Sequence, residues 1–228
     1  MPSQQTRIII SFTIALLAHV IALLGIFSQY RQAFIEATPF MLMLMFVLIL
    51  FTQERINKPF LIFVLTAFII SILAELIGVH TGFLFGDYKY GKLLGPTIKE
   101  VPWVIGINWF IVVYCAGVFT QSMYTTIEKR FPPDNLLPSK VQRFSIIIDG
   151  AFIITFFDWV MDGAVVKLGF WNWWNTGNAP VYNYVCWFFV SALLLLFFEL
   201  LNFKKQNQFA VHLFIIQLLF FFALRTFL

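Results

Sequence analysis

Seven long apolar segments constrain the fold of this chain more than any other feature. They cover residues 8–27, 39–52, 59–79, 102–122, 144–166, 181–201 and 209–227. A helix needs about 20 apolar residues to cross a bilayer. Of the 228 residues, 61% are hydrophobic and only 11% are charged, whereas soluble domains carry about 25% charged residues. The sequence therefore predicts an all-α, polytopic bundle of about seven transmembrane helices, forming one domain over residues 1–228.

The second apolar segment is the least typical of a membrane span. It is short, and Pro39 and the charged pair Glu54 and Arg55 lie at its two ends. An alternative is that its helix begins inside the preceding loop. The number of spans depends on whether this segment crosses the membrane.

Lysine and arginine lie singly or in pairs at the ends of the apolar segments, which favours membrane anchoring and speaks against a nucleic-acid partner. In a seven-span arrangement nine of them fall on one side: Arg7, Arg55, Lys58, Lys129, Arg130, Lys140, Arg143, Lys204 and Lys205. Six fall on the other: Arg31, Lys89, Lys92, Lys99, Lys167 and Arg225. This small bias favours a cytoplasmic N-terminus in the cell membrane. The 78–101 and 167–180 loops are expected to lie together on the outer face.

Carboxylic acids inside the apolar segments are the strongest indication of a functional site. An ionised side chain at the bilayer centre costs about 2.5–3.5 kcal/mol on insertion scales. Asp158 and Asp162 are four residues apart, so they share one helix face with about 6 Å of rise between them. Two acids this close in a dry interior oppose each other's ionisation, so one is expected to hold its proton and to serve as a general acid. The alternative is a hydrogen-bonded pair that only joins helices. Asp149, near the start of the same segment, is either functional or an interfacial acid.

Counting residues along the helices places these acids with other polar groups in one layer. At about 1.5 Å per residue, Glu75 lies roughly 24 Å from the start of its segment at Pro59. Asp158 and Asp162 lie roughly 21 and 27 Å from the start of theirs. A layer near one face would thus contain Glu75, His80, Asp158, Asp162, Asn183 and Trp187. His80 is open to a simpler reading, a local hydrogen bond at a helix end.

Aromatic residues gather at the same level. The stretch KLGFWNWWNTGNAPVYN contains Trp171, Trp173 and Trp174. Tryptophan also forms belts at membrane interfaces, so these residues are either a belt or a surface for a flat polyene or a cation. Metal ligation is not expected, because Cys115, Cys186 and the histidines do not lie at ligand spacing.

Three stretches in this order resemble the integral-membrane carotenoid hydratase family: ELIGVHTGFLFGDYKY, FDWVMDGAVVKLGFWNW and APVYNYVCW. That family includes γ-carotene 1′,2′-hydratases and bisanhydrobacterioruberin hydratases, often described only as carotenoid biosynthesis proteins. The resemblance covers about residues 70–200. It leads us to expect a proline where Gly163 stands, a difference that concerns the helix geometry at Asp162.

The resemblance implies addition of water across the terminal C1=C2 double bond of an acyclic carotenoid, giving a tertiary alcohol with no cofactor. Our hypothesis is that Asp158 or Asp162 donates the proton while Glu75 and His80 position water. Residues expected to contact the substrate are Asp87, Tyr88, Tyr90, Trp171, Trp173, Trp174, Asn183 and Trp187. The expected partners are the lipid bilayer, a carotenoid (lycopene, γ-carotene or a C50 precursor) and other enzymes of the pathway.

Two other functions are consistent with the same residues. A membrane-bound lycopene cyclase also protonates a carotenoid end but then closes a ring. A proton-coupled transporter also carries buried acids, although transporters more often show inverted repeats or helices broken near the midplane.

Overall fold

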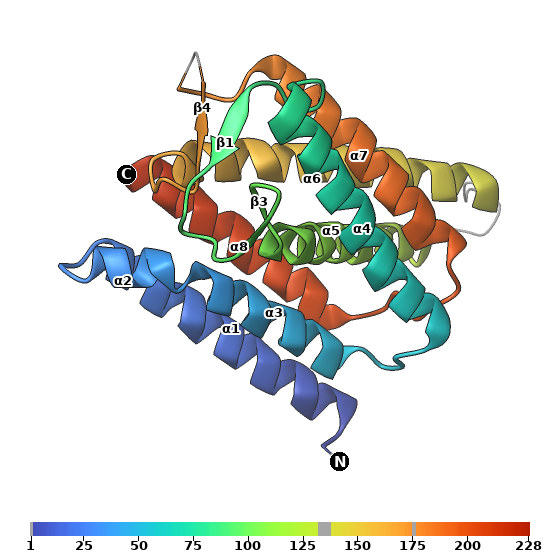
Figure 1. Cartoon of the computed structure of the whole chain (residues 1–228). Coiled ribbons are helices and arrows are strands. Elements are labelled where there is room, and N and C mark those ends of the chain that lie inside the picture. The colour runs from blue at the N-terminus through green and yellow to red at the C-terminus, as the bar shows by residue number, and fades with distance from the viewer. Residues whose placement is uncertain (1, 132–137, 175–176) are drawn as a thin grey trace.

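The computed structural model describes residues 2–131, 138–174 and 177–228. This part of the chain is mainly helical, as expected from the apolar segments (Figure 1). Its helices are α1 (Gln4–Ile26), α2 (Arg31–Glu36), α3 (Thr38–Thr52), α4 (Lys58–Thr81), α5 (Val104–Glu128), α6 (Ser139–Val165), α7 (Val181–Leu200) and α8 (Gln208–Phe227). Its short strands are β1 (Tyr88–Tyr90), β2 (Thr97–Ile98), β3 (Val101–Pro102) and β4 (Trp171–Trp173).

Six of the helices, α1 and α4 to α8, are long and apolar enough to cross a membrane. The remaining apolar segment, the second along the chain, forms α3. This helix has 15 residues and so extends about 22 Å, less than the roughly 30 Å of a bilayer core. It nevertheless runs back beside α1, as Figure 1 shows, so the chain still alternates between two ends. The chain is a multi-pass membrane protein.

Local capping signals explain where several helices begin and end. The Ser3 hydroxyl accepts a hydrogen bond from the Thr6 N–H at 3.1 Å, which caps α1. Asn57 caps α4 in the same way, and Gly82 ends that helix with a left-handed φ of 65°. Helix α5 continues to Glu128, beyond its expected end at residue 122.

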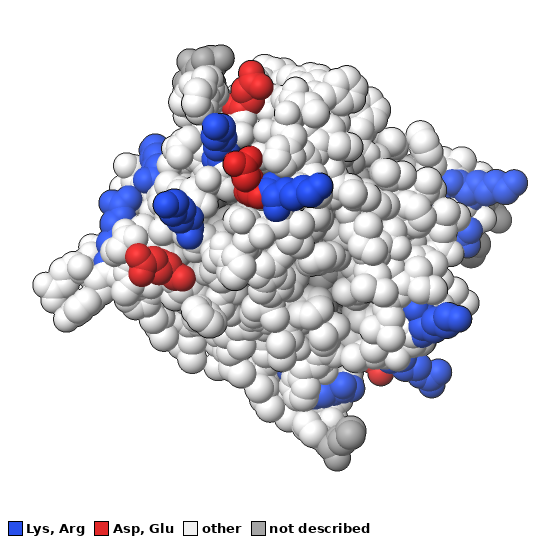
Figure 2. Space-filling model, in the orientation of Figure 1, with Lys and Arg blue, Asp and Glu red and all other residues white. Residues whose placement is uncertain are grey.

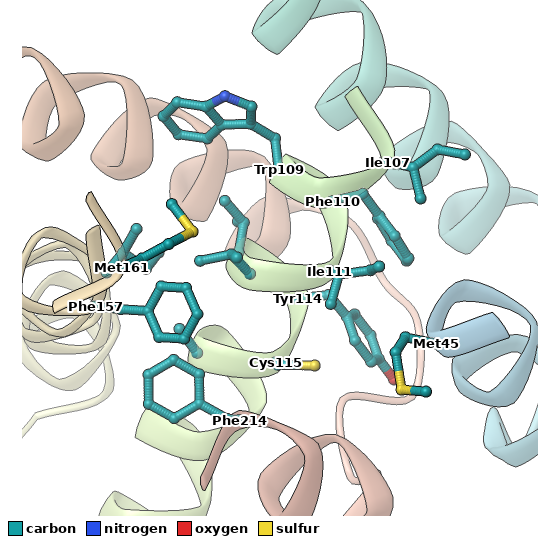
Figure 3. Close-up of a cluster of buried hydrophobic side chains, with 14 of the residues drawn as sticks. Met45, Ile107, Trp109, Phe110, Ile111, Tyr114, Cys115, Phe157, Met161 and Phe214 are labelled. Atoms are coloured by element: carbon teal, nitrogen blue, oxygen red, sulfur yellow. The ribbon is translucent and has the colours of Figure 1, made fainter. Parts of the chain in front are cut away.

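Helix α5 lies at the centre of the bundle, where it contacts α3, α4, α6, α7 and α8. Figure 3 shows its side chains pointing outward in several directions into the surrounding helices. Trp109, Phe110 and Tyr114 are fully buried there, and Phe157 and Phe214 approach from α6 and α8. A helix that is apolar on all sides is stable only when other helices cover it, so α5 determines how the others are arranged.

Hydrogen bonds between distant segments define one end of the bundle. The Gln4 side chain donates to the Thr52 carbonyl at 2.7 Å, and the Gln53 side chain donates to the Lys204 carbonyl at 2.8 Å. The start of α1, the end of α3 and the loop before α8 therefore lie together.

The opposite end is covered by a two-stranded antiparallel sheet. Strand β1 pairs with β4, and Tyr88 lies opposite Trp173 while Tyr90 lies opposite Trp171. The Gly91 N–H extends the pairing to the Phe170 carbonyl at 2.8 Å. A side chain at Gly91 would place its Cβ 2.3 Å from the Gly169 carbonyl oxygen, so glycine is required there. The 78–101 and 167–180 loops thus lie together, as predicted. Figure 2 shows charged residues at both ends of the bundle and an uncharged band between them.

We expect the replacement Tyr114→Phe to destabilise the bundle. The Tyr114 hydroxyl donates to Gln53 Oε1 at 2.5 Å and accepts from Asn207 Nδ2 at 3.2 Å, and all three residues are buried. Loss of the hydroxyl leaves buried polar groups unpaired, at a cost of about 1–3 kcal/mol. The free energy of unfolding in mixed micelles measures this.

The matched control is Tyr124→Phe on the same helix, whose hydroxyl bonds with Asp149 at an exposed position. Its effect should be much smaller, and equal losses for the two variants would contradict the proposed importance of the buried network.

Candidate functional site

Three carboxyl groups from two helices meet beneath the β1–β4 sheet. Glu75 lies near the end of α4, and Asp158 and Asp162 lie on one face of α6. All three are buried, at 4%, 1% and 4% exposure respectively. The layer of acids expected from the residue count is therefore present at the end of the bundle that the sheet covers.

The acids line a cavity of about 20 Å³, which is room for about one water molecule. Its wall is formed by Glu75, Phe85, Tyr88, Tyr90, Asp158, Asp162, Trp171, Trp173, Asn183 and Trp187. Nine of these ten residues were predicted from the sequence as site residues, and Phe85 was not. The cavity thus combines acids, one amide and aromatic rings.

The sheet supplies four of the hydrogen-bond donors in this site. Side chains alternate between the two faces of a strand, so the aromatic residues of β1 and β4 face the acids while the intervening residues face outward. Lys89 and Asn172, which lie opposite each other in the pairing, are exposed. One face of the sheet therefore presents two tyrosine hydroxyls and two indole N–H groups to the bundle.

Glu75 is held by three donors. Tyr88 and Tyr90 both donate to its Oε2, Tyr90 at 2.7 Å, and Trp109 Nε1 donates to its Oε1 at 2.8 Å. Two of these donors come from β1 and the third from α5. The carboxyl group is therefore fixed in position, and it joins α4 to the central helix and to the sheet.

Burial raises the pKa of Tyr88 and Tyr90 well above its usual range, and the neighbouring charge of Glu75 raises it further. Both hydroxyls consequently stay protonated at physiological pH. They act as permanent donors to Glu75.

Asp162 is held by two indole groups. Trp171 Nε1 and Trp173 Nε1 both donate to its Oδ1, at 2.8 and 3.0 Å. Helix α6 continues regularly past this residue, since the Val166 N–H donates to the Asp162 carbonyl at 3.2 Å. The difference at Gly163 does not break the helix. A Cβ there would lie 2.6 Å from Arg225 Nη1, so glycine leaves room for the guanidinium group.

Asp158 differs from the other two acids. Within the described residues its side chain accepts one hydrogen bond, from Asn183 Nδ2 to Oδ2 at 2.9 Å. The residue is 1% exposed, and it lines the cavity. A buried carboxyl oxygen without a donor is costly when the group is charged, whereas a protonated carboxyl group keeps an O–H to donate. In the part of the chain that the structure describes, Asp158 has fewer side-chain donors than Glu75 or Asp162.

Three expected site residues are not brought to the cavity. His80 is exposed, and its Nε2 donates to the Lys99 carbonyl at 3.1 Å, so its placement does not support a water-positioning role. Asp87 is exposed, and its carbonyl accepts from the Trp174 N–H at 2.9 Å. The Trp174 ring is 67% exposed and lies under Lys89 Nζ at 4.7 Å. Asp149 is likewise exposed and lies outside the cavity.

Sequence reasoning missed Trp109 and Phe85. The Trp109 ring stacks on Trp187 with the ring centroids 3.9 Å apart, and its indole N–H reaches Glu75. A buried indole N–H usually needs an acceptor, so a tryptophan early in an otherwise apolar segment was an available signal. Phe85 had no such signal, because an apolar ring carries no polar atom that requires a partner.

In the described part of the chain, no three histidine, cysteine, aspartate or glutamate side chains come together as a metal-binding group.

Comparison with known proteins shows the family to which the chain belongs. The family model described as "Carotenoid biosynthesis protein" matches residues 34–228, a range that includes all three acids and the whole sheet. A comparison with curated proteins and one with solved structures each gave no significant match. Because the match covers most of the length of the chain, the chain belongs to the carotenoid biosynthesis protein family and has a role in carotenoid biosynthesis.

Proposed function

We propose that the protein is a carotenoid 1,2-hydratase, which adds water to the terminal C1=C2 double bond of an acyclic carotenoid. The observation that carries the proposal is the position of Asp158, a buried acid that accepts one hydrogen bond within the described residues, from Asn183, beside a cavity of about 20 Å³. Glu75 and Asp162 line the same cavity and are each held by several donors. One proton donor and two fixed carboxyl groups around a water-sized space suit hydration.

The proposed reaction begins with proton transfer from the Asp158 carboxyl group to C2. The two π electrons of C1=C2 form the new C–H bond, which leaves a tertiary cation at C1. The oxygen of water then bonds to C1, and Glu75 or Asp162 accepts the proton that this water releases. Return of that proton to Asp158 completes the cycle. The net change is the addition of one water molecule, with no oxidation or reduction.

The walls of the cavity suit the cationic intermediate. Trp187, Tyr88 and Trp173 line it with aromatic rings, and a cation within about 6 Å of a ring centroid is attracted to the ring face. The carboxylates of Glu75 and Asp162 add favourable charge. Capture by water, rather than ring closure, then depends on a water molecule held between these groups.

Pigment analysis tests the activity directly. We expect a lycopene-producing bacterium that expresses this chain to form a more polar pigment, heavier by one or two waters and with an unchanged chromophore. Chromatography with mass spectrometry measures this, and γ-carotene serves as the second substrate. A product of unchanged mass with a shortened chromophore would identify a cyclase instead, and an unaltered pigment with both substrates would refute the proposal.

We expect Asp158→Asn to lower hydration by about 100-fold or more, the usual contribution of a general acid. The matched control is Asp149→Asn on the same helix, because Asp149 is exposed and lies outside the cavity. The product formed per amount of membrane protein is the measurement. Similar activities of the two variants would exclude Asp158 as the proton donor.

We expect His80→Ala to keep most of the activity, since His80 is exposed and bonds with a loop carbonyl. Trp109→Phe removes a donor to Glu75 and should reduce activity more strongly. The same product assay compares the two variants. A larger loss in His80→Ala would show that the histidine takes part in the reaction after all.

A further inference from the structure

A second, much larger cavity lies beside the acid cavity. It has a volume of about 360 Å³ and is lined by residues of α1, α2, α3, α5, α6 and α8 and of the segment that leads into β4. Its wall is mainly aliphatic and aromatic, with Ala22, Met45, Val165 and Leu224 among its residues. An apolar cavity of this size is typical of a ligand site.

This cavity opens sideways toward the bilayer. Ile21 on α1 and Phe40 and Leu44 on α3 line it, and they are also 55%, 78% and 36% exposed on the surface of the bundle. Figure 1 shows that α1 and α3 lie together at one side of the bundle. A molecule dissolved in the lipid can therefore enter between these helices without crossing the aqueous phase.

One residue connects the two cavities. Trp171 lines both of them, and its indole N–H donates to Asp162 at 2.8 Å. Met161, the neighbour of Asp162 on α6, also lines the large cavity. Trp171 thus belongs to the walls of both the apolar cavity and the cavity that contains the acids.

We propose that the large cavity binds the polyene chain of an acyclic carotenoid, admits it from the bilayer and directs its end past Trp171 to Asp158. This inference rests on the hydratase function proposed above. The small cavity has room for about one water molecule and not for a branched hydrocarbon end. The Trp171 ring must therefore move when the chain end arrives, and its hydrogen bond with Asp162 opens at that moment.

Ligand retention tests the proposal separately from catalysis. The protein carries Asp158→Asn throughout, so that bound lycopene is not consumed, and is purified in detergent from lycopene-producing cells. Adding Ala22→Phe fills the large cavity with a ring. The control is Leu24→Phe on the same helix, at a position that is 67% exposed and outside the cavity. Absorbance gives the amount of lycopene per protein.

We expect Ala22→Phe to reduce the lycopene content at least about tenfold relative to Leu24→Phe, because overpacking opposes binding. Thermal unfolding and gel filtration verify that both variants fold. If Ala22→Phe does not fold, Leu44→Trp at the opening takes its place. Equal lycopene content in the filled and control proteins would overturn the proposal. Loss of lycopene on filling, combined with a wild-type protein that makes no hydrated pigment, would keep the binding site and refute the hydratase function.

Discussion

The hydrogen bonds from the β1–β4 sheet to the buried acids are the interaction on which the rest of the site depends. Carboxyl groups are unfavourable inside a bilayer, and hydrogen-bond donors reduce that cost. Four donors stand on one face of six paired residues, two for Glu75 and two for Asp162. Because the strands pair, the backbone segments that carry the two sets of donors cannot shift independently. The sheet therefore fixes the separation of α4 and α6 at the end where the acids lie.

This arrangement leaves the third acid in a different environment. Among the residues that the structure describes, Asp158 receives no donor from the sheet, and its side chain accepts from the Asn183 amide on α7. Its neighbours Glu75 and Asp162 are fixed in place as acceptors of several hydrogen bonds, and all three acids line the cavity. Under the proposed reaction, this difference in the number of donors is what assigns the acid role to Asp158 and the base role to Glu75 or Asp162.

Much of this was accessible from the sequence, because bilayers impose simple rules on composition. Apolar segment length predicted the helices, and residue counts along them predicted that Glu75, Asp158 and Asp162 lie at one level. The same helix geometry also argues against a position for the His80 side chain beside Glu75, and the sequence analysis did not apply it. Five residues separate it from Glu75, a rotation of about 140° around the helix, so the two side chains face different directions.

Other features had no sequence signal strong enough to find them. Strands of three residues are too short to show an alternating pattern above chance, so the pairing of Tyr88 with Trp173 was not predicted. The large apolar cavity was equally hidden. It arises where several helices fail to pack closely, and most residues along it are apolar and also fit an ordinary buried or lipid-facing position.

The acids lie near one end of the bundle only, and this has a consequence for a carotenoid with two reactive ends. Under the proposed reaction, a new hydroxyl group forms at the depth of the sheet and prefers the nearby headgroup region. The untouched end then points toward the opposite leaflet. To be hydrated in turn, the molecule has to leave sideways, carry its alcohol across the hydrocarbon core and return reversed. Such transverse reorientation of a polar end is slow, so movement across the membrane would limit the rate of the second hydration.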